Sequence, residues 1–124
     1  MTVVVDAGGL IGFDRHERRA VGVITRCIER GDTLVVPAPV IAQTWRDGRR
    51  QARLARLLSS PQVSVEPLDD RRAREAGQLC GVSGTADIAD AAVVVAARRH
   101  RAKVLTSDSA DITRLDPSLA CVPC

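Results

Sequence analysis

The stretch Thr85-Ala-Asp-Ile-Ala-Asp-Ala-Ala-Val-Val-Val-Ala-Ala97 is apolar on almost every side when it is drawn as a helix. A helix of that kind is buried, so it belongs in the interior of a domain. We expect Thr85 to be its N-cap and the helix to run to about His100. Two carboxylates, Asp87 and Asp90, lie in its first turns. Because burying a carboxylate is costly unless it is paired or binds a metal, the helix marks a candidate functional site.

Short apolar runs on both sides of this helix predict the strands of a parallel sheet. The first run, Val3-Val4-Val5, ends at Asp6 and is followed by Ala7-Gly8-Gly9, which we expect to form a turn. Apolar strands that alternate with helices are typical of an α/β fold whose parallel sheet is covered on both faces. The other strands are expected at 33–36, 63–65, 103–106 and 120–122.

Apolar residues at helical spacing predict the helices that connect these strands. One helix is expected from about Arg15 to Arg30, with Gly31 as its stop signal. The remaining helices are expected at 40–45, 49–58, about 71–80 and, briefly, 110–115. Asp47-Gly48 separates the second from the third, and Gly81 and Gly84 are expected to end the fourth.

Length and composition predict one domain that spans residues 1–124. The chain is 45% hydrophobic with a net charge of +3, which argues against disorder. No apolar run approaches the roughly 20 residues of a membrane-spanning helix. The N-terminus reaches Asp6 too early for a signal peptide. We therefore expect a cytoplasmic protein with no membrane partner.

The composition contains few aromatic residues and many arginines. One Trp, one Phe and no Tyr disfavour a fold that stacks bases on aromatic side chains. Among 18 basic residues, Lys103 is the one lysine. An arginine-rich surface suits phosphate contacts, but the codon bias of a GC-rich genome explains it as well. The basic pI permits a nucleic-acid partner without demonstrating one.

Cysteine and histidine patterns do not predict a metal or redox site. Of the four cysteines, only Cys121 and Cys124 have C-x-x-C spacing, and no second pair completes a zinc site. We expect the cysteines to be structural, with Cys27 and Cys80 in the core. His16 and His100 lie among charged residues and are expected at the surface.

Acidic residues follow two of the expected strands, and ligands of a parallel sheet bind outside the carboxyl ends of its strands. Asp6 directly follows the first strand and has little structural purpose before Ala-Gly-Gly, which favours a functional role. Asp108 follows the fourth strand, although it also suits a turn or a helix cap. Stabilisation of a helix end explains Asp87 as well as chemistry does. Asp111 is expected to be a solvated helix residue.

The oxygen ligands of this set favour a hard cation, Mg²⁺ or Mn²⁺. The sequence has no G-x-x-x-x-G-K-[ST], no G-x-G-x-x-G and no G-x-S-x-G, which argues against ATPase, dinucleotide-binding and serine-hydrolase readings. Metal-assisted hydrolysis of a phosphoryl group is the chemistry that remains.

Three segments together resemble the PIN-domain ribonucleases, in particular the VapC-type toxins of bacterial toxin–antitoxin systems. They are Val-Val-Val-Asp6, Val-Val-Pro-Ala-Pro-Val-Ile-Ala-Gln43-Thr-Trp-Arg46, and Asp90-Ala-Ala-Val-Val-Val-Ala-Ala97 followed by Val-Leu-Thr-Ser-Asp108. Each segment alone has low specificity, but together the three occur in the family's order and span almost the whole chain.

This resemblance implies a three-layer α/β/α sandwich with a central parallel, Rossmann-like sheet. It also implies RNA cleavage with Mg²⁺ or Mn²⁺ held by Asp6, Asp90 and Asp108. Asp87 lies one helical turn before Asp90 and would supply or orient a further oxygen. The family's second acid, usually Glu, is Gln43 here, a neutral auxiliary position that predicts weaker metal binding or reduced activity.

The resemblance further implies an RNA substrate, products with a 5′-phosphate and a 3′-hydroxyl, a small antitoxin partner and a homodimer. We expect the antitoxin to dock on the helices from Val40 to Leu58, with Trp45 as its aromatic anchor; the alternative is that Trp45 is a core residue. Arg49, Arg53 and Arg56 share one helical face by their spacing. They either contact RNA or an acidic partner, or form a solvated face.

Two other functions stay open at this point. One is a PIN-fold binding protein with a depleted site that acts through antitoxin or RNA binding, which Gln43 favours. The other is a receiver-like signalling domain, which also gathers acids at strand ends. Its late lysine would be Lys103, but that residue begins a strand, which argues against this class.

Overall fold

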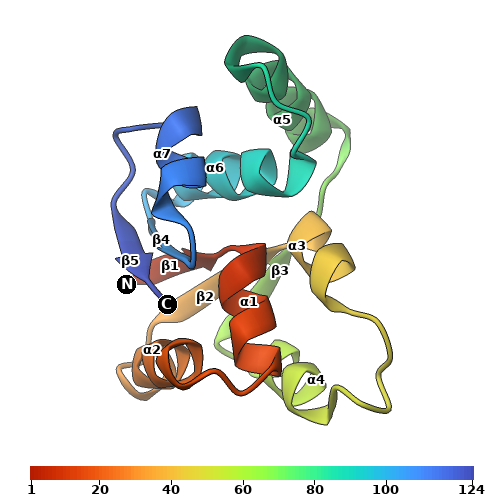
Figure 1. Ribbon diagram of the computed structural model, residues 1–124, viewed down its shortest axis with the longest axis vertical. Coiled ribbons are helices and arrows are strands. Elements are labelled where there is room, and N and C mark those ends of the chain that lie inside the picture. Colours follow the sequence, from red (N-terminus) through yellow and green to blue (C-terminus); the bar gives the residue numbers. More distant parts are fainter.

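A parallel sheet of five strands organises the chain in this computed structural model, which describes residues 1–124 (Figure 1). The strand order is β3-β2-β1-β4-β5, and Val4 at the centre pairs with Val35 on one side and Val104 on the other. These central positions are fully or almost fully buried, because helices cover both faces. The strands are β1 (Thr2–Val5), β2 (Thr33–Pro37), β3 (Val63–Glu66), β4 (Lys103–Thr106) and β5 (Cys121–Pro123).

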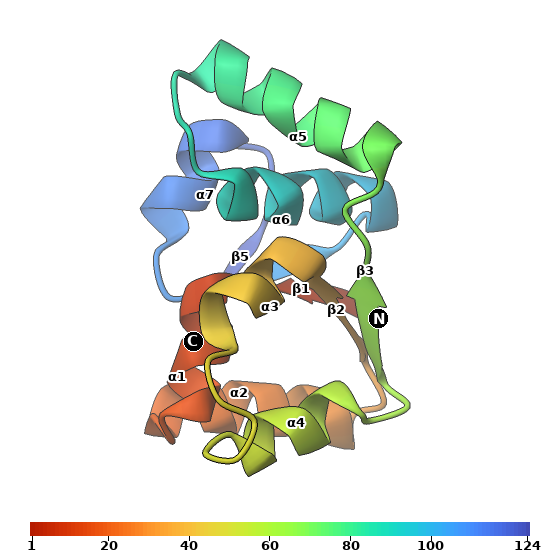
Figure 2. The ribbon, with the colours of Figure 1, turned by 90° about the vertical axis from the view of Figure 1, so that its right-hand side faces the viewer.

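Helices on both faces make the predicted three-layer α/β/α sandwich (Figure 2). On one face lie α2 (Arg18–Glu29) and α4 (Ala52–Leu58); on the other lie α6 (Ile88–His100) and α7 (Ser109–Leu115). The amphipathic α5 (Asp70–Ser83) packs on the outer side of α6. At the ends where β1 and β2 terminate, α1 (Ala7–Asp14) and α3 (Ala38–Thr44) begin.

The strand order excludes the receiver-like alternative. Receiver domains have the order 2-1-3-4-5, whereas this sheet has 3-2-1-4-5, the order of the first five strands of a Rossmann sheet. Lys103 lies at the start of β4, at the opposite end from the carboxyl edge. The direction of winding reverses between β1 and β4, and that is the position where an open α/β sheet binds its ligand.

Helix α6 is the buried helix that its composition predicts, but it begins later than expected. Asp87, and not Thr85, is its N-cap, because the Asp87 carboxylate accepts a hydrogen bond from the N–H of Asp90 at 2.9 Å. The Thr85 hydroxyl instead accepts from the N–H of Asp87 at 3.2 Å. Gly81 does not end the preceding helix; α5 continues through it and ends at Gly84, whose φ of 70° is left-handed.

The expected turn at Ala7-Gly8-Gly9 is wrong, because these residues form the start of α1. Glycine is a poor helix former, but here it permits close approach. A Cβ at Gly8 would lie 1.8 Å from the Ser107 Oγ, and one at Gly12 would lie 2.9 Å from the Ala20 Cβ. The helix expected from Arg15 to Arg30 accordingly begins only at Arg18.

Helix α4 is shorter than expected, which changes the interpretation of three arginines. It begins at Ala52, so Arg49 lies in the turn before it and does not share a helical face with Arg53 and Arg56. The expected locations of the cysteines and histidines are confirmed for Cys27 and Cys80, which are buried, and for His16 and His100, which are exposed. The His100 Nε2 contacts the Glu66 carboxylate at 2.8 Å.

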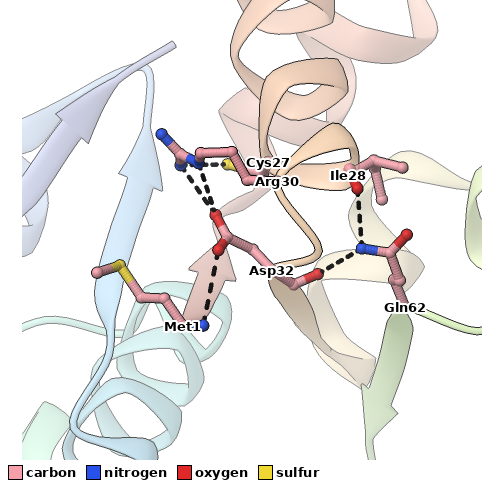
Figure 3. A network of polar contacts seen from close by, with 6 residues as sticks. All are labelled: Met1, Cys27, Ile28, Arg30, Asp32 and Gln62. Atoms are coloured by element: carbon pink, nitrogen blue, oxygen red, sulfur yellow. Dashed lines mark hydrogen bonds and ion pairs between the residues drawn. The ribbon is translucent and has the colours of Figure 1, made fainter.

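A polar network ties together the amino ends of β1, β2 and β3 (Figure 3). The buried Asp32 carboxylate accepts a hydrogen bond from the Arg30 guanidinium at 2.8 Å and lies 3.6 Å from the N-terminal ammonium of Met1. The Gln62 Nε2 donates to the carbonyls of Ile28 at 3.0 Å and Asp32 at 2.9 Å. This network belongs to the edge of the sheet opposite the carboxyl ends.

No single helix is long and apolar enough to cross a membrane. Helices α5 and α6 reach that length and composition only when taken together, and they are bent by 112° at their junction. The apolar residues of α6 between Ala89 and Ala97 are buried inside the domain.

Candidate active site

The winding of the sheet brings Asp6 and Asp108 to neighbouring strand ends. Asp6 directly follows β1, and Asp108 follows β4, the strand that pairs with β1. Asp6 is only 5% exposed, and its Oδ1 accepts a hydrogen bond from the N–H of Gly9 at 2.7 Å. Asp6 therefore does have a structural purpose, contrary to expectation, because it is the N-cap of α1.

The other predicted acids are also linked to helix N-termini. Asp87 caps α6 as described, and the Asp108 Oδ1 caps α7 by accepting from the N–H of Ala110 at 3.1 Å. Asp90 lies in the first turn of α6. The partial positive charge of a helix N-terminus stabilises each carboxylate, which lets acids gather at one edge of the sheet.

Thr106, which was not among the predicted site residues, links two of these acids. It is the last residue of β4 and is 1% exposed. Its Oγ1 accepts from the N–H of Asp108 at 2.9 Å, and the hydroxyl lies beside the Asp6 carboxylate, where it favours the ionised form. The sequence signal for this role was a polar residue at the end of an otherwise apolar strand, in Val-Leu-Thr-Ser-Asp108.

The acids perturb one another electrostatically. Burial raises the pKa of Asp90 to about 7, with further contributions from the negative charges of Asp87, Asp111 and Asp6. Burial also raises the pKa of Asp6, and the charge of Asp108 adds to this effect. The five carboxylates thus form one electrostatic unit, which we call the acid cluster (Asp6, Asp87, Asp90, Asp108 and Asp111).

Asp111 belongs to the acid cluster and is not simply the solvated helix residue that was expected. It is half-buried and, with Asp87 and Asp90, lines a hollow of about 130 Å³. Arg114 is the one basic residue that lines this hollow. Asp111 follows Asp108 by three residues, one turn along α7, so its position was the signal for its role.

The donor set has the chemistry of a hard-cation site, but its geometry is open. The acids carry carboxylate oxygens, and none of them forms an ion pair with a basic side chain. No three Asp, Glu, His or Cys side chains converge closely enough in this structure to hold a metal ion. Residue type and uncompensated negative charge fit Mg²⁺ or Mn²⁺, and closure around an ion requires side-chain movement.

Gln43 lies apart from the hollow that contains Asp90. It is exposed in the last turn of α3 and lines a different hollow of about 550 Å³ with Arg15 and Arg46. Trp45 is not a core residue, because it is 38% exposed and packs against Gly48.

Comparisons with known proteins agree with the fold. The family model of the PIN domain matches residues 3–116. Among solved structures, a chain of VapBC2 from Rickettsia felis, crystallised bound to a DNA fragment from its promoter, has a TM-score of 0.71 at 14% identity, covering 100% of this chain and 99% of that chain. A chain of a toxin–antitoxin complex from Klebsiella pneumoniae has a TM-score of 0.69 at 15% identity, with coverage of 97% and 95%.

A third similar structure is FitAcB from Neisseria gonorrhoeae, with a TM-score of 0.62 at 19% identity and coverage of 96% of this chain and 95% of that chain. At these identities the likeness concerns the fold. No curated protein matches the sequence at a significant level.

Proposed function

Since the chain belongs to the PIN-domain family, whose members are generally nucleases, we propose that it is a metal-dependent ribonuclease acting as the toxin of a toxin–antitoxin pair. The observation that carries this proposal is the acid cluster at the winding reversal of the sheet. Asp6 and Asp108 follow paired strands there, and the half-buried Asp90 has a pKa raised to about 7.

Asp6, Asp90 and Asp108 would hold Mg²⁺ or Mn²⁺. When bound, the ion would lower the pKa of a water ligand and neutralise charge on the scissile phosphate. Asp87 fixes the first turn of α6 through its bond to the N–H of Asp90, and so positions that residue. In-line attack by water would leave a 5′-phosphate and a 3′-hydroxyl, as the family resemblance implies.

The test is RNA cleavage by the purified protein with Mg²⁺ or Mn²⁺, comparing Asp6→Asn with the wild type. Asparagine caps a helix as well as aspartate does, so α1 should remain folded while the charge is lost. We expect cleavage to be abolished. Asp69→Asn is the matched control, because Asp69 caps α5 in the same way, accepting from the N–H of Arg72 at 2.9 Å, far along the chain from the acid cluster.

Mapping of new 5′-phosphate ends across the transcriptome after induction would identify the RNA and the cleavage site. A wild-type protein that neither cuts RNA nor binds Mn²⁺ near millimolar concentration would contradict the proposal.

A second candidate is a catalytically weakened PIN protein that acts by binding RNA or an antitoxin. Gln43 in place of the usual Glu and the open geometry of the acid cluster favour it. Metal titration combined with the cleavage assay separates the two candidates, because the weakened protein would bind its partner without cutting RNA.

An antitoxin partner is part of the proposal, and an apolar hollow of about 280 Å³ between α1, α2 and α4 supports it. Phe13, Ile28 and Leu57 line this hollow, with Arg53 and Arg56 beside them. It adjoins α4, within the expected docking segment from Val40 to Leu58, where Trp45 is also partly exposed. Co-purification with the product of the adjacent gene, with and without Trp45→Ala, tests this surface.

A homodimer and a cytoplasmic location are further expectations, which size-exclusion chromatography and cell fractionation address.

A further inference from the structure

A second polar hollow, of about 550 Å³, lies near the end of α1 that is remote from Asp6. Three arginines line it: Arg15 directly follows α1, and Arg46 and Arg50 belong to the segment between α3 and α4. The Gln51 Nε2 donates to the Asp14 Oδ2 at 3.0 Å and so links the end of this segment to the end of α1. Together with Gln43, these residues form what we call the arginine pocket.

The arginines of this pocket are not neutralised by its carboxylates. Arg15 and Arg46 form no ion pair, and Arg50 reaches the Asp47 carboxylate only at 3.9 Å. The Asp47 Oδ1 accepts from the N–H of Arg49 at 3.0 Å, while the Asp14 Oδ2 accepts from the Gln51 amide at 3.0 Å. Both carboxylates therefore hold the local backbone and side chains, and the guanidinium groups of Arg15 and Arg46 remain available for an anion.

The buried Gln51 fixes the shape of the pocket. Its Oε1 accepts from the N–H groups of Arg46 at 2.7 Å and Asp47 at 2.9 Å, and its Nε2 donates to the Thr44 carbonyl at 2.8 Å. These bonds anchor the segment that carries Arg46 and Arg50. A ligand would consequently meet an ordered backbone, which reduces the entropy lost on binding.

The Arg46 guanidinium is itself oriented by the backbone. Its Nη1 donates to the carbonyls of Ala42 and Trp45, each at 2.8 Å. The edge formed by Nε and Nη2 stays free, and such an edge binds a phosphate through two parallel hydrogen bonds.

We propose that the arginine pocket binds a backbone phosphate of the RNA, as a subsite next to the acid cluster; this rests on the proposed ribonuclease function. The acid cluster by itself repels a polyanion, so RNA needs a basic contact nearby. Helix α1 begins at the acid cluster and ends at the arginine pocket, and its 8 residues span about 12 Å. One RNA strand laid along α1 meets both.

Two other arginine-bearing hollows are less suited to phosphate. Between α5 and α6, Arg98 is paired with Asp116 at 2.6 Å and Arg71 with Glu75 at 3.5 Å, which leaves Arg99 as the one unpaired arginine of that hollow. In the apolar hollow, Arg53 lies over the Phe13 ring. The neutral amide of Gln43 also matters, because a carboxylate at this position would compete with phosphate for Arg15 and Arg46.

The experiment measures binding of a fluorescein-labelled single-stranded RNA by fluorescence anisotropy, with EDTA present and Asp6→Asn as the background. In that background we expect Arg15→Gln to raise the Kd several-fold and to lower the slope of log K against log salt by about 0.7, the value for one lost phosphate contact. The loss should be equal on two RNAs of unrelated sequence, because phosphate contacts carry no base information. Arg50→Gln should act in the same direction, and Gln43→Glu should also weaken binding.

Arg26→Gln is the matched control, since Arg26 is exposed on α2, forms no ion pair and loses the same charge. The proposal is overturned if Arg15→Gln leaves Kd and salt slope unchanged, or if Arg26→Gln has an equal effect. Competition with a poly-glutamate peptide gives a further test. The proposal is also overturned, in favour of an acidic protein ligand, if this peptide displaces the labelled RNA at a lower concentration of negative charges than unlabelled RNA does. Because the measurement requires no catalysis, RNA bound here but never cut would contradict only the proposed ribonuclease function.

Discussion

At the scale of the residue, the acid cluster depends on a side chain that has no charge. The Thr106 hydroxyl accepts from the N–H of Asp108 and lies beside the Asp6 carboxylate. It therefore positions the two acids that follow β1 and β4. Residues that orient ligands in this way commonly change metal affinity or activity by about 10–100-fold when they are replaced.

Thr106→Val should accordingly lower the rate of RNA cleavage by about 10–100-fold, since valine has a similar volume but no hydroxyl. Thr106→Ser keeps the hydroxyl and should retain most of the activity. The measurement is the single-turnover cleavage rate together with the concentration of Mn²⁺ that gives half the maximal rate. A valine variant that keeps its activity while the serine variant loses it would show that packing matters and the hydroxyl does not.

A second residue-scale prediction concerns Asp116, which is 8% exposed. Hydrogen bonds from Ser118 and then from Arg98 lower the pKa of Asp116 to about 2. The pKa of Asp116 in the folded state lies below its unfolded value of about 3.9. The ionised carboxylate therefore stabilises the fold at pH values above about 3.9. This contribution is lost as the pH falls from there toward about 2.

Asp116→Asn should therefore flatten the pH dependence of stability in that acidic range. The check is the free energy of unfolding of wild type and variant in urea at a series of pH values. A difference between the two that stays constant as the pH falls would contradict this account.

At the scale of the element, the residues at the helix ends place the acids and terminate the helices. Asp6, Asp69, Asp87 and Asp108 each cap a helix, and three of these caps belong to the acid cluster. The opposite ends differ: α5 ends at Gly84 with φ 70°, whereas α6 ends at Arg101 with φ 51°, a left-handed conformation that is costly for a residue with a side chain.

Gly84→Ala should lower the free energy of unfolding by about 1 kcal/mol, because alanine is strained in the left-handed region. No heavy atom lies within 4 Å of the position that a Cβ would take, so the loss would come from the backbone alone. Arg101→Gly is the complementary variant and should be neutral or stabilising. Urea denaturation measures both, and a stabilising Gly84→Ala would refute the argument.

At the scale of the whole molecule, the two edges of the sheet serve different purposes. The network of Asp32, Arg30 and Gln62 fastens the amino ends of three strands (Figure 3). Asp6 and Asp108 of the acid cluster follow the carboxyl ends of β1 and β4. Stability and chemistry should therefore respond to separate substitutions.

Gln62→Ala removes the side-chain donor to the carbonyls of Ile28 and Asp32, of which Ile28 keeps the N–H of Gly31 at 3.0 Å, and should cost about 1–2 kcal/mol of unfolding free energy. Its cleavage rate per folded molecule should equal that of the wild type. Asp6→Asn should show the reverse pattern. Thermal unfolding and cleavage rates on both variants test this separation, and a Gln62→Ala variant that is folded but inactive would contradict it.

The sequence by itself determined the alternation of strands and helices, the parallel sheet, the burial of α6 and the strand-end placement of Asp6 and Asp108. These properties are local, because apolar periodicity and the residue after a strand can be read without knowing what packs against them. The tertiary structure alone decided that glycine-rich 7–12 is helical, since contacts with Ser107 and Ala20 require small residues there. It also brought Thr106 and Asp111 to the acid cluster and placed Gln43 with Arg15 and Arg46, because the strand order and the path between α3 and α4 depend on contacts between segments distant in the chain.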